Sequence, residues 1–162
     1  MPPITPSLWF DQNLEEAATF YTSVFPDSRI EGFHRATDAG PGAPGTVLFG
    51  SFVLNGTRFI GINGGPQFPF SEAVSFTIDC KDQDEVDYYW NRLTDGGQES
   101  QCGWLKDRFG LSWQIVPVRL YELLSDPDPA LATAATLAMY GMRKIVIADL
   151  DEAAEQAARK AT

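Results

Sequence analysis

The sequence predicts an α+β fold in which a unit of one strand, one helix and three further strands (βαβββ) occurs twice and is followed by a helical tail. The first observation is an internal repeat: a shift of 68 positions places Ser7–Asp11 over Ser75–Asp79 and Phe20–Phe25 over Tyr88–Leu93. The second is that strand, helix cap, aromatic pair and helix keep the same order in both copies. The third is that the sequence patterns typical of strands end at Pro117 and patterns typical of helices follow. We interpret the repeat as a duplication rather than as a chance similarity between two amphipathic strand–helix units.

These observations divide the chain into modules. We expect two βαβββ modules, at about 1–66 and 72–118, which together form one domain over residues 1–118. A helical extension then covers residues 119–162. A chain of this length can bury a proper hydrophobic core.

The first module has clear helix and turn signals. Asn13 and Glu16 have the spacing of a capping box, which places a helix start at this point. Asn55-Gly56 is a typical two-residue hairpin turn. A Gly/Pro-rich loop is expected at 38–45. The expected strands are 4–10, 29–35, 46–54 and 58–62, and the expected helix is 14–25.

The second module repeats these signals. Asp82 and Glu85 again have capping-box spacing, and Gly96-Gly97 ends the helix that they begin. The hairpin that follows turns at Asp107-Arg108-Phe109-Gly110. The expected strands are 74–79 and the two arms of this hairpin, which spans Cys102–Pro117.

The tail reads as mainly helical. Its expected elements are a helix at 119–124, a turn at 126–129, an Ala-rich helix at about 130–142, a short extended piece at 143–150 and a last polar helix capped by Asp151. Nothing in these residues indicates chemistry.

The last predicted strand presents two different faces. Because side chains alternate along a strand, Ser112, Gln114 and Val116 point to one face, and Trp113 and Ile115 point to the other. One face therefore carries a polar amide among apolar groups. This arrangement is typical of a pocket wall and also of an ordinary half-buried hairpin.

Charge and composition limit the partners and the compartment. The formal net charge is −10, from 22 acidic and 12 basic residues, which argues against nucleic acid or an anionic membrane as a partner. The N-terminus does not resemble a signal peptide, and no apolar run is long enough to span a membrane. Cys80 and Cys102 have neither zinc-site nor redox-motif spacing. We expect free thiols in a cytoplasmic protein, with a single disulfide as the alternative.

Few residues support catalysis. The one histidine, His34, lies in a predicted strand, so a transition-metal site with several histidine ligands is excluded. Cys102 has no histidine close in sequence to activate it, so an inert thiol is the better interpretation. Asp11, Asp79 and Asp107 lie at strand ends and are the general acid–base candidates. Asp11 and Asp79 occupy equivalent places in the repeat, which favours a structural role for these two.

The chain resembles the vicinal oxygen chelate superfamily of glyoxalases and bleomycin-resistance proteins. More narrowly, it is similar to the PhnB-like branch, which is often labelled 3-demethylubiquinone-9 3-methyltransferase-like. The segments that carry the resemblance are Leu8–Ser28, Phe59–Phe76, Asp82–Leu93 and Cys102–Pro117, together with KIVIADL in the tail.

The resemblance implies paired βαβββ modules (the glyoxalase or VOC fold) that curl around a cavity, usually in a homodimer. It also implies a divalent metal held by a histidine on the first strand, a histidine on the fifth and a glutamate on the last. Here the corresponding positions are Ile4 or Pro6, Ala73-Val74-Ser75, and Gln114. Gln114 is a weak neutral donor, so we predict no metal ligand and no cofactor.

The expected function is therefore binding of a small, partly apolar molecule in the sheet cavity, by a sequestering protein or a metal-independent enzyme. The first alternative is a metal-dependent lyase, isomerase or dioxygenase that uses other carboxylates. The second is a scaffold that interacts through its tail. The sequence contains no motif for binding a methyl donor, which argues against methyl transfer. The ligand-binding residues that we expect are Gln114, Trp104, Cys102, Asn63 and Trp9.

Overall fold

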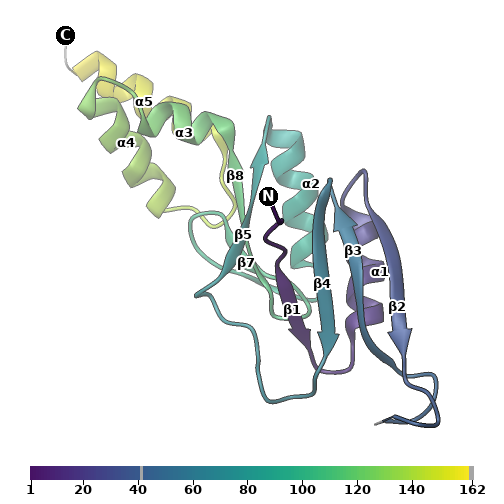
Figure 1. Cartoon of the computed structure of the whole chain (residues 1–162). Coiled ribbons are helices and arrows are strands. Elements are labelled where there is room, and N and C mark those ends of the chain that lie inside the picture. The colour runs from purple at the N-terminus through teal and green to yellow at the C-terminus, as the bar shows by residue number, and fades with distance from the viewer. Residues whose placement is uncertain (41, 161–162) are drawn as a thin grey trace. The chain divides into compact units, whose positions relative to one another are not determined.

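The computed structural model describes residues 1–40 and 42–160 (Figure 1). Pro41 of the predicted Gly/Pro loop and the last two residues of the predicted tail lie outside the described residues. The chain forms two compact units, residues 1–70 and 71–162. The grouping of both modules into one domain stays a prediction.

The first unit is a four-stranded sheet with one helix. Its elements are β1 (Ser7–Phe10), α1 (Leu14–Val24), β2 (Arg29–Arg35), β3 (Val47–Leu54) and β4 (Thr57–Asn63). The strands lie in the order β1-β4-β3-β2, with β1 parallel to β4 and the other pairs antiparallel. The Asn55-Gly56 hairpin joins β3 and β4 as predicted, with φ of 47° and 79° at the two residues.

Helix α1 packs on one face of this sheet. Leu14 and Tyr21 are fully buried and Phe10 is nearly so. A methyl group on Gly61 would lie 2.1 Å from a Leu14 methyl carbon, so only glycine lets the helix approach β4 this closely. The buried residues of α1 are Leu14, Ala17, Ala18, Tyr21 and Val24, which recur at the spacing of one helix face.

The second unit repeats this plan. Its elements are β5 (Ser75–Cys80), α2 (Gln83–Thr94), β6 (Gln98–Glu99), β7 (Trp104–Lys106) and β8 (Ser112–Pro117), followed by α3 (Val118–Leu124), α4 (Pro129–Tyr140) and α5 (Ile147–Lys160). The strand order β5-β8-β7-β6 matches that of the first sheet, with β5 and β8 parallel. The prediction of paired βαβββ modules with a C-terminal helical tail is confirmed.

The two helix caps turn out differently. At α2, the Asp82 carboxylate accepts a hydrogen bond from the Glu85 backbone N–H at 2.9 Å, as predicted. At α1, Asn13 occupies the cap position but its side chain makes no capping bond, so the predicted capping box is wrong. The side-chain oxygen of Asn63, at the end of β4, instead accepts the Leu14 N–H at 3.0 Å. A partner 49 residues away has replaced the local cap.

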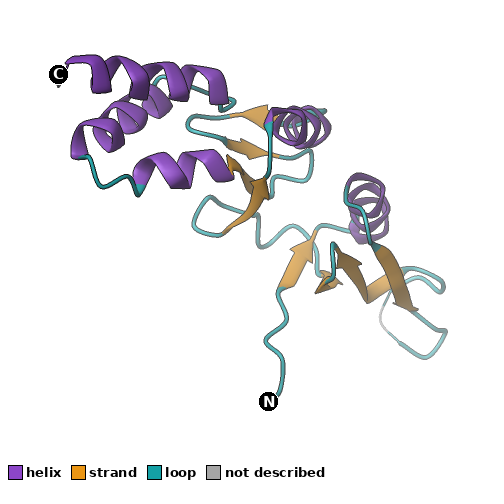
Figure 2. Cartoon of the chain, turned by 90° about the horizontal axis from the view of Figure 1, so that it is seen from above, coloured by secondary structure: helices purple, strands orange, loops and turns teal. Residues whose placement is uncertain are grey.

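The tail packs its three helices side by side at one end of the second unit (Figure 2). They share a hydrophobic cluster with the last strand. Its buried members are Val116, Leu120, Leu123, Ala135, Ile145, Leu150 and Ala154. The cluster includes Val116, so the extension covers one end of the face of β8 that also carries Gln114.

The predicted extended piece at 143–150 and the Asp151 cap are wrong, because α5 begins at Ile147. Gln83 of α2 provides the reason. Its side-chain oxygen accepts the Ile147 N–H at 2.9 Å, and its side-chain NH2 donates to the Ile145 carbonyl at 3.1 Å. The helix is thus capped from another element, and the residues before it form a strap.

This strap, residues 142–146, is tied to the start of β7. The backbone N–H groups of Cys102 and Gly103 donate to the carbonyls of Met142 and Arg143 at 2.8 and 2.7 Å. Gly103 has φ of 82°, and a methyl group there would lie 2.7 Å from the Ile115 carbonyl. Glycine is therefore required where the strap meets the sheet.

Candidate functional site

The face of the second sheet opposite α2 carries the polar side chains. Residues in register share a face, so Gln114 lies beside Thr77 of β5 on one side and Trp104 of β7 on the other. Trp113 and Ile115 are buried on the α2 side. The predicted alternation along this strand is confirmed, and we call this side of the sheet the open face.

A small pocket of about 120 Å³ lies on this face at the β6–β7–β8 end. Its lining residues are Glu72, Gln98, Glu99, Ser100, Trp104, Leu105, Lys106 and Ser112. Lys106 and Glu72 form an ion pair of 2.6 Å beside it. The pocket thus has an aromatic wall, a buried hydroxyl and a charged rim.

Ser112 is the unusual member of this pocket. Its side chain is fully buried, and its Oγ has no hydrogen-bond partner among the described residues. Buried hydroxyl groups normally have a partner, because an unpaired one keeps its full desolvation cost. Sequence analysis placed Ser112 on the correct face but did not select it. A serine inside the apolar run SWQIVP was the available signal.

Trp104 lines the same pocket as Ser112, whereas Gln114 lies two residues further along β8 on the same face and is not among the lining residues. The Gln114 side-chain NH2 donates to the Ser75 hydroxyl at 2.9 Å, which orients the amide and leaves its Oε1 without a partner in the described structure. Of the four tryptophan indoles, those of Trp9, Trp90 and Trp113 donate to protein oxygens. No such bond is made by the Trp104 indole to the described residues.

Cys102, by contrast, is not among the residues that line this pocket. It precedes β7 with φ of 57°, and its backbone is tied to the strap. The other thiol, Cys80, is buried, and this burial raises its pKa to about 12, with help from the carboxylates of Glu85, Asp79 and Asp82. Both cysteines are free, and Cys80 stays protonated and unreactive at neutral pH.

Trp9 and Asn63 belong to the first unit. The Trp9 indole donates to the Gly65 carbonyl at 2.9 Å and packs edge-on against Phe68 at 5.0 Å between ring centroids. The Asn63 amide accepts the Leu14 N–H and donates to the Val47 carbonyl at 3.0 Å. The Asn63 side chain therefore positions α1. Within the second unit, the structure brings Gln114 and Trp104 together, and ligand contact by any of the five residues stays a prediction.

Of the three aspartates considered for acid–base chemistry, Asp11 and Asp79 are exposed and Asp107 is buried. Asp107 is buried, and its carboxylate accepts the backbone N–H groups of Phe109 and Leu111 and the Trp113 indole N–H at 2.8 to 3.1 Å. It therefore holds the predicted hairpin turn. Asp79 is exposed on the open face. Partial burial is the main cause of a raised pKa of the Tyr121 phenol, and the nearby Asp79 carboxylate raises this pKa further.

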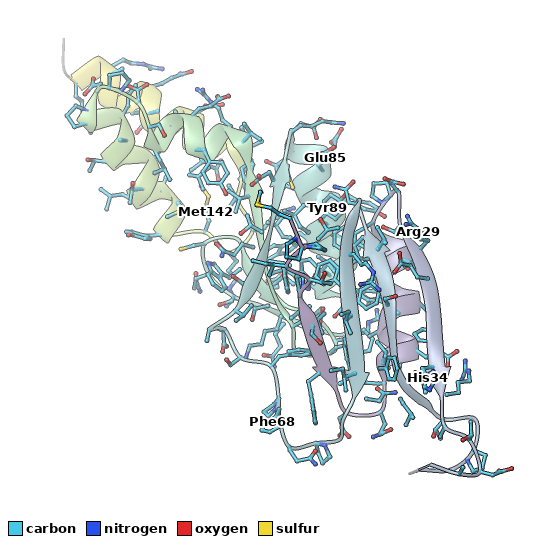
Figure 3. The ribbon with its side chains drawn as sticks, viewed as in Figure 1. Arg29, His34, Phe68, Glu85, Tyr89 and Met142 are labelled. Atoms are coloured by element: carbon cyan, nitrogen blue, oxygen red, sulfur yellow. The ribbon has the colours of Figure 1, made fainter. Side chains whose placement is uncertain are left out.

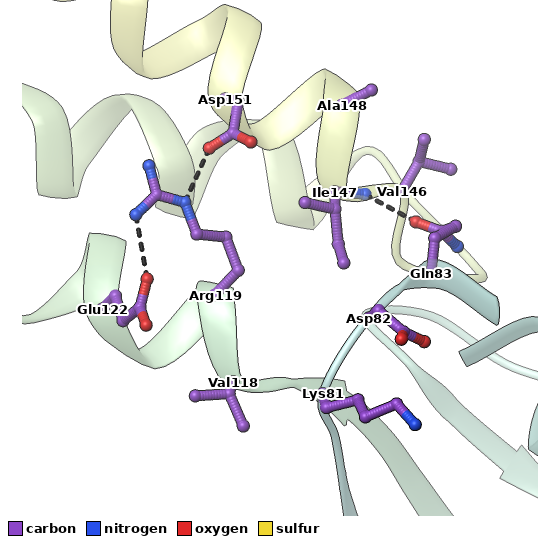
Figure 4. A pocket seen from close by; sticks show the side chains of 10 residues that line it. All are labelled: Lys81, Asp82, Gln83, Val118, Arg119, Glu122, Val146, Ile147, Ala148 and Asp151. Carbon is purple, nitrogen blue, oxygen red and sulfur yellow. Dashed lines mark hydrogen bonds and ion pairs between the residues drawn. The ribbon is translucent and has the colours of Figure 1, made fainter. Parts of the chain in front are cut away.

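A larger pocket, of about 620 Å³, lies where the extension meets the loop between β5 and α2 (Figure 4). Arg119 bridges α3 and α5 by pairing with Glu122 at 2.9 Å and with Asp151 at 2.7 Å. The complete lining is Lys81, Asp82, Gln83, Val118, Arg119, Glu122, Val146, Ile147, Ala148 and Asp151. Sequence analysis missed this pocket because its walls meet only through packing of the tail.

The side chains present do not fit the metal of the wider superfamily. The resemblance implies a glutamate and a histidine as metal ligands on the last and the fifth strand. At these places the Gln114 amide donates a hydrogen bond to the Ser75 hydroxyl, and both groups are neutral. Among the described residues, no group of three or more His, Cys, Asp or Glu side chains could hold a metal ion. His34, on β2 of the first unit (Figure 3), stacks on Phe49 with ring centroids 4.8 Å apart.

Comparison with known proteins gives a consistent assignment. A family model described as 3-demethylubiquinone-9 3-methyltransferase matches residues 2–116. The structure of a PhnB protein from Bacillus cereus, which carries the same methyltransferase label, is 34% identical. It covers 72% of this chain and 100% of its own, with a TM-score of 0.67. No curated protein matches the chain.

Two further structures share the fold at lower identity. A protein from Pseudomonas aeruginosa is 20% identical over 72% of this chain and 98% of its own, with a TM-score of 0.60. The fosfomycin resistance protein FosX from Listeria monocytogenes is 15% identical over 77% and 98%, with a TM-score of 0.54. Separately, none of the helices in the described part of the chain has the length and apolarity needed to cross a membrane.

Proposed function

Because the chain belongs to the PhnB-like family of the vicinal oxygen chelate superfamily, we propose that it binds a small, partly apolar molecule on the open face of its second sheet and needs no metal to do so. The methyltransferase label is the name of the family model and carries no donor-binding motif in this chain. Homodimeric assembly, a cytoplasmic location and the lack of nucleic-acid or membrane partners stay predictions.

The observation that carries this proposal is the unpartnered Ser112 hydroxyl in the pocket wall. A buried polar group without a partner costs about 1–3 kcal/mol. A ligand atom that hydrogen-bonds to Ser112 Oγ would recover this cost, so the pocket favours a molecule with a polar group at its inserted end.

The neighbouring groups define the rest of the ligand. The Trp104 ring offers an apolar wall and an indole N–H that can donate to a ligand, and Gln114 Oε1, beside the pocket, can accept a hydrogen bond. The pocket is small, at about 120 Å³, so only one end of a ligand enters it and the remainder lies along the open face. An aromatic or cyclic amide or phenol has this combination of a flat apolar body and polar edge.

The proposal is tested first by native mass spectrometry and elemental analysis of freshly purified, untagged protein. A stoichiometric organic adduct without metal supports it. Stoichiometric divalent metal would overturn the metal-free part and favour a metal-dependent lyase, isomerase or dioxygenase.

The site itself is tested with benzamide and phenol as probes in ligand-observed NMR. We expect Trp104→Ala to weaken probe binding by about tenfold or more, because it removes the apolar wall. Asn91→Ala changes an exposed residue of α2, on the opposite side of the sheet from the open face, and it should leave binding unchanged. Equal binding by the wild type and the Trp104 variant would reject the site.

A further inference from the structure

The small pocket on the open face gathers three hydrogen-bond donors that the described structure uses little. Lys106 faces Ser112 across the β7–β8 pair, and Trp104 precedes Lys106 by two residues on the same face. The Ser112 hydroxyl is buried without a hydrogen-bond partner among the described residues, and the Trp104 indole makes no bond to them. The Lys106 ammonium pairs with the Glu72 carboxylate at 2.6 Å. A hydroxyl, an indole N–H and an ammonium on one wall favour an acceptor, and an anion most of all.

The two carboxylates of the pocket have different partners. Glu99 accepts the Trp90 indole N–H through Oε1 at 3.0 Å, and its Oε2 lies 3.6 Å from Arg143. Both of these partners lie outside the pocket lining. Glu72, in the turn before β5, is the carboxylate that lies on Lys106. The position of Glu72 therefore shows where an anion fits beside the donors of the pocket.

Glu72 is placed so that a ligand can replace it on Lys106. The Glu72 side chain is 63% exposed, and the Lys106 side chain is 33% exposed. Ion pairs with this exposure contribute little to stability, so Lys106 can exchange Glu72 for another carboxylate easily. The hydrogen bond from Lys106 is the main cause of a lowered pKa of the Glu72 carboxyl, which keeps Glu72 an anion at neutral pH. Lys106 thus already binds a group of the chemical class that we expect in the ligand.

A ligand without negative charge would use this pocket less completely. A neutral ligand can bond to Ser112 and Trp104 but leaves the ion pair of Lys106 and Glu72 in place. A cation would be repelled by the Lys106 ammonium at the rim. A carboxylate has enough lone pairs to accept hydrogen bonds from all three donors, and because it takes the place of Glu72, the charge beside Lys106 stays balanced. This local pairing offsets the net charge of −10, which by itself opposes the binding of an anion.

We propose that the ligand of this pocket is an aromatic acid, whose carboxylate replaces that of Glu72 on Lys106 and accepts a hydrogen bond from Ser112 while its ring lies against Trp104. This inference rests on the proposed function and narrows it, because it assigns a negative charge to the inserted polar end of the ligand. The polar edge of the ligand remains beside Gln114, as proposed above. Glu72 is then a residue that competes with the ligand for Lys106.

Benzoate and benzamide test the charge of the ligand, because they have the same shape and only benzoate is an anion. In ligand-observed NMR titrations, we expect the wild type to bind benzoate more tightly than benzamide. Glu72→Gln removes the competing carboxylate and should strengthen benzoate binding by about fivefold. Lys106→Met removes the ammonium and should weaken benzoate binding by about tenfold or more. Both variants should bind benzamide within about twofold of the wild type, which also shows that the pocket is still folded.

Glu99→Gln provides the matched control, since it removes the same charge from the same pocket at a carboxylate held by Trp90 and Arg143. It should change benzoate binding by less than about twofold. Benzamide binding without a preference for benzoate, or an equal gain in the Glu72 and Glu99 variants, would overturn the inference and leave the proposed function standing. A wild type that binds neither probe would instead reject the site itself, and the inference with it.

Discussion

At the scale of single residues, the described hydrogen bonds separate polar groups with structural roles from those left for a ligand. Asp107 was a candidate acid by its position, yet its carboxylate accepts two backbone N–H groups of the turn and the Trp113 indole N–H. The Ser112 hydroxyl, at the start of β8, has no hydrogen-bond partner among the described residues. Both are buried polar residues a few positions apart, and only their partners distinguish them.

Replacing Asp107 with alanine should destabilise the fold. The change removes the carboxylate that accepts the Trp113 indole N–H and two backbone N–H groups of the turn, so we expect a loss of about 2–4 kcal/mol in the free energy of unfolding. Urea denaturation followed by tryptophan fluorescence measures this loss.

The matched control is Asp95→Ala. Asp95 makes an exposed ion pair with Arg108 at 2.8 Å, and such pairs contribute about 0–1 kcal/mol. If both variants lost the same small amount of stability, Asp107 would not hold the turn in the way that its contacts indicate.

At the scale of elements, local signals predicted most of the secondary structure. The Asn55-Gly56 turn, the Asp82 cap and the alternation along β8 each depend on residues close in sequence, and each is confirmed. The errors share one cause. Where a cap comes from a distant element, as at Leu14 and Ile147, no local pattern could indicate it.

The link between Gln83 and the strap leads to a prediction for the extension. Gln83→Ala removes the bonds to the Ile145 carbonyl and the Ile147 N–H, which frees the start of α5. We expect faster hydrogen–deuterium exchange over residues 142–150 and a stability loss of about 1–3 kcal/mol.

Gln156→Ala provides the comparison for this experiment. Gln156 lies on the exposed side of α5 and bonds only to Glu152 in the described structure, at 3.1 Å. Its removal should leave exchange in the strap unchanged. Equal protection of the strap in both variants would show that Gln83 does not cap α5.

At the scale of the whole molecule, the duplication allowed the fold to be predicted from the sequence. Only part of the candidate site could be predicted in this way. Periodicity brought Gln114 and Trp104 onto one face, because strand register follows from the hairpin. The contribution of Lys106 and Glu72 depends on a contact between residues 34 positions apart, which no local pattern carries. The tail was predicted as helical, but its packing against β8 required the three-dimensional structure.

The net charge of −10 gives a prediction at this scale. Like charges on one folded chain repel each other, and salt screens that repulsion over a length of about 10 Å at 0.1 M. We therefore expect the free energy of unfolding to rise as NaCl increases from about 20 to 300 mM, measured by urea denaturation at constant pH. Exposed ion pairs weaken over the same range, but each contributes only about 0–1 kcal/mol. A free energy of unfolding that falls steadily with salt would instead indicate that these ion pairs outweigh the net repulsion.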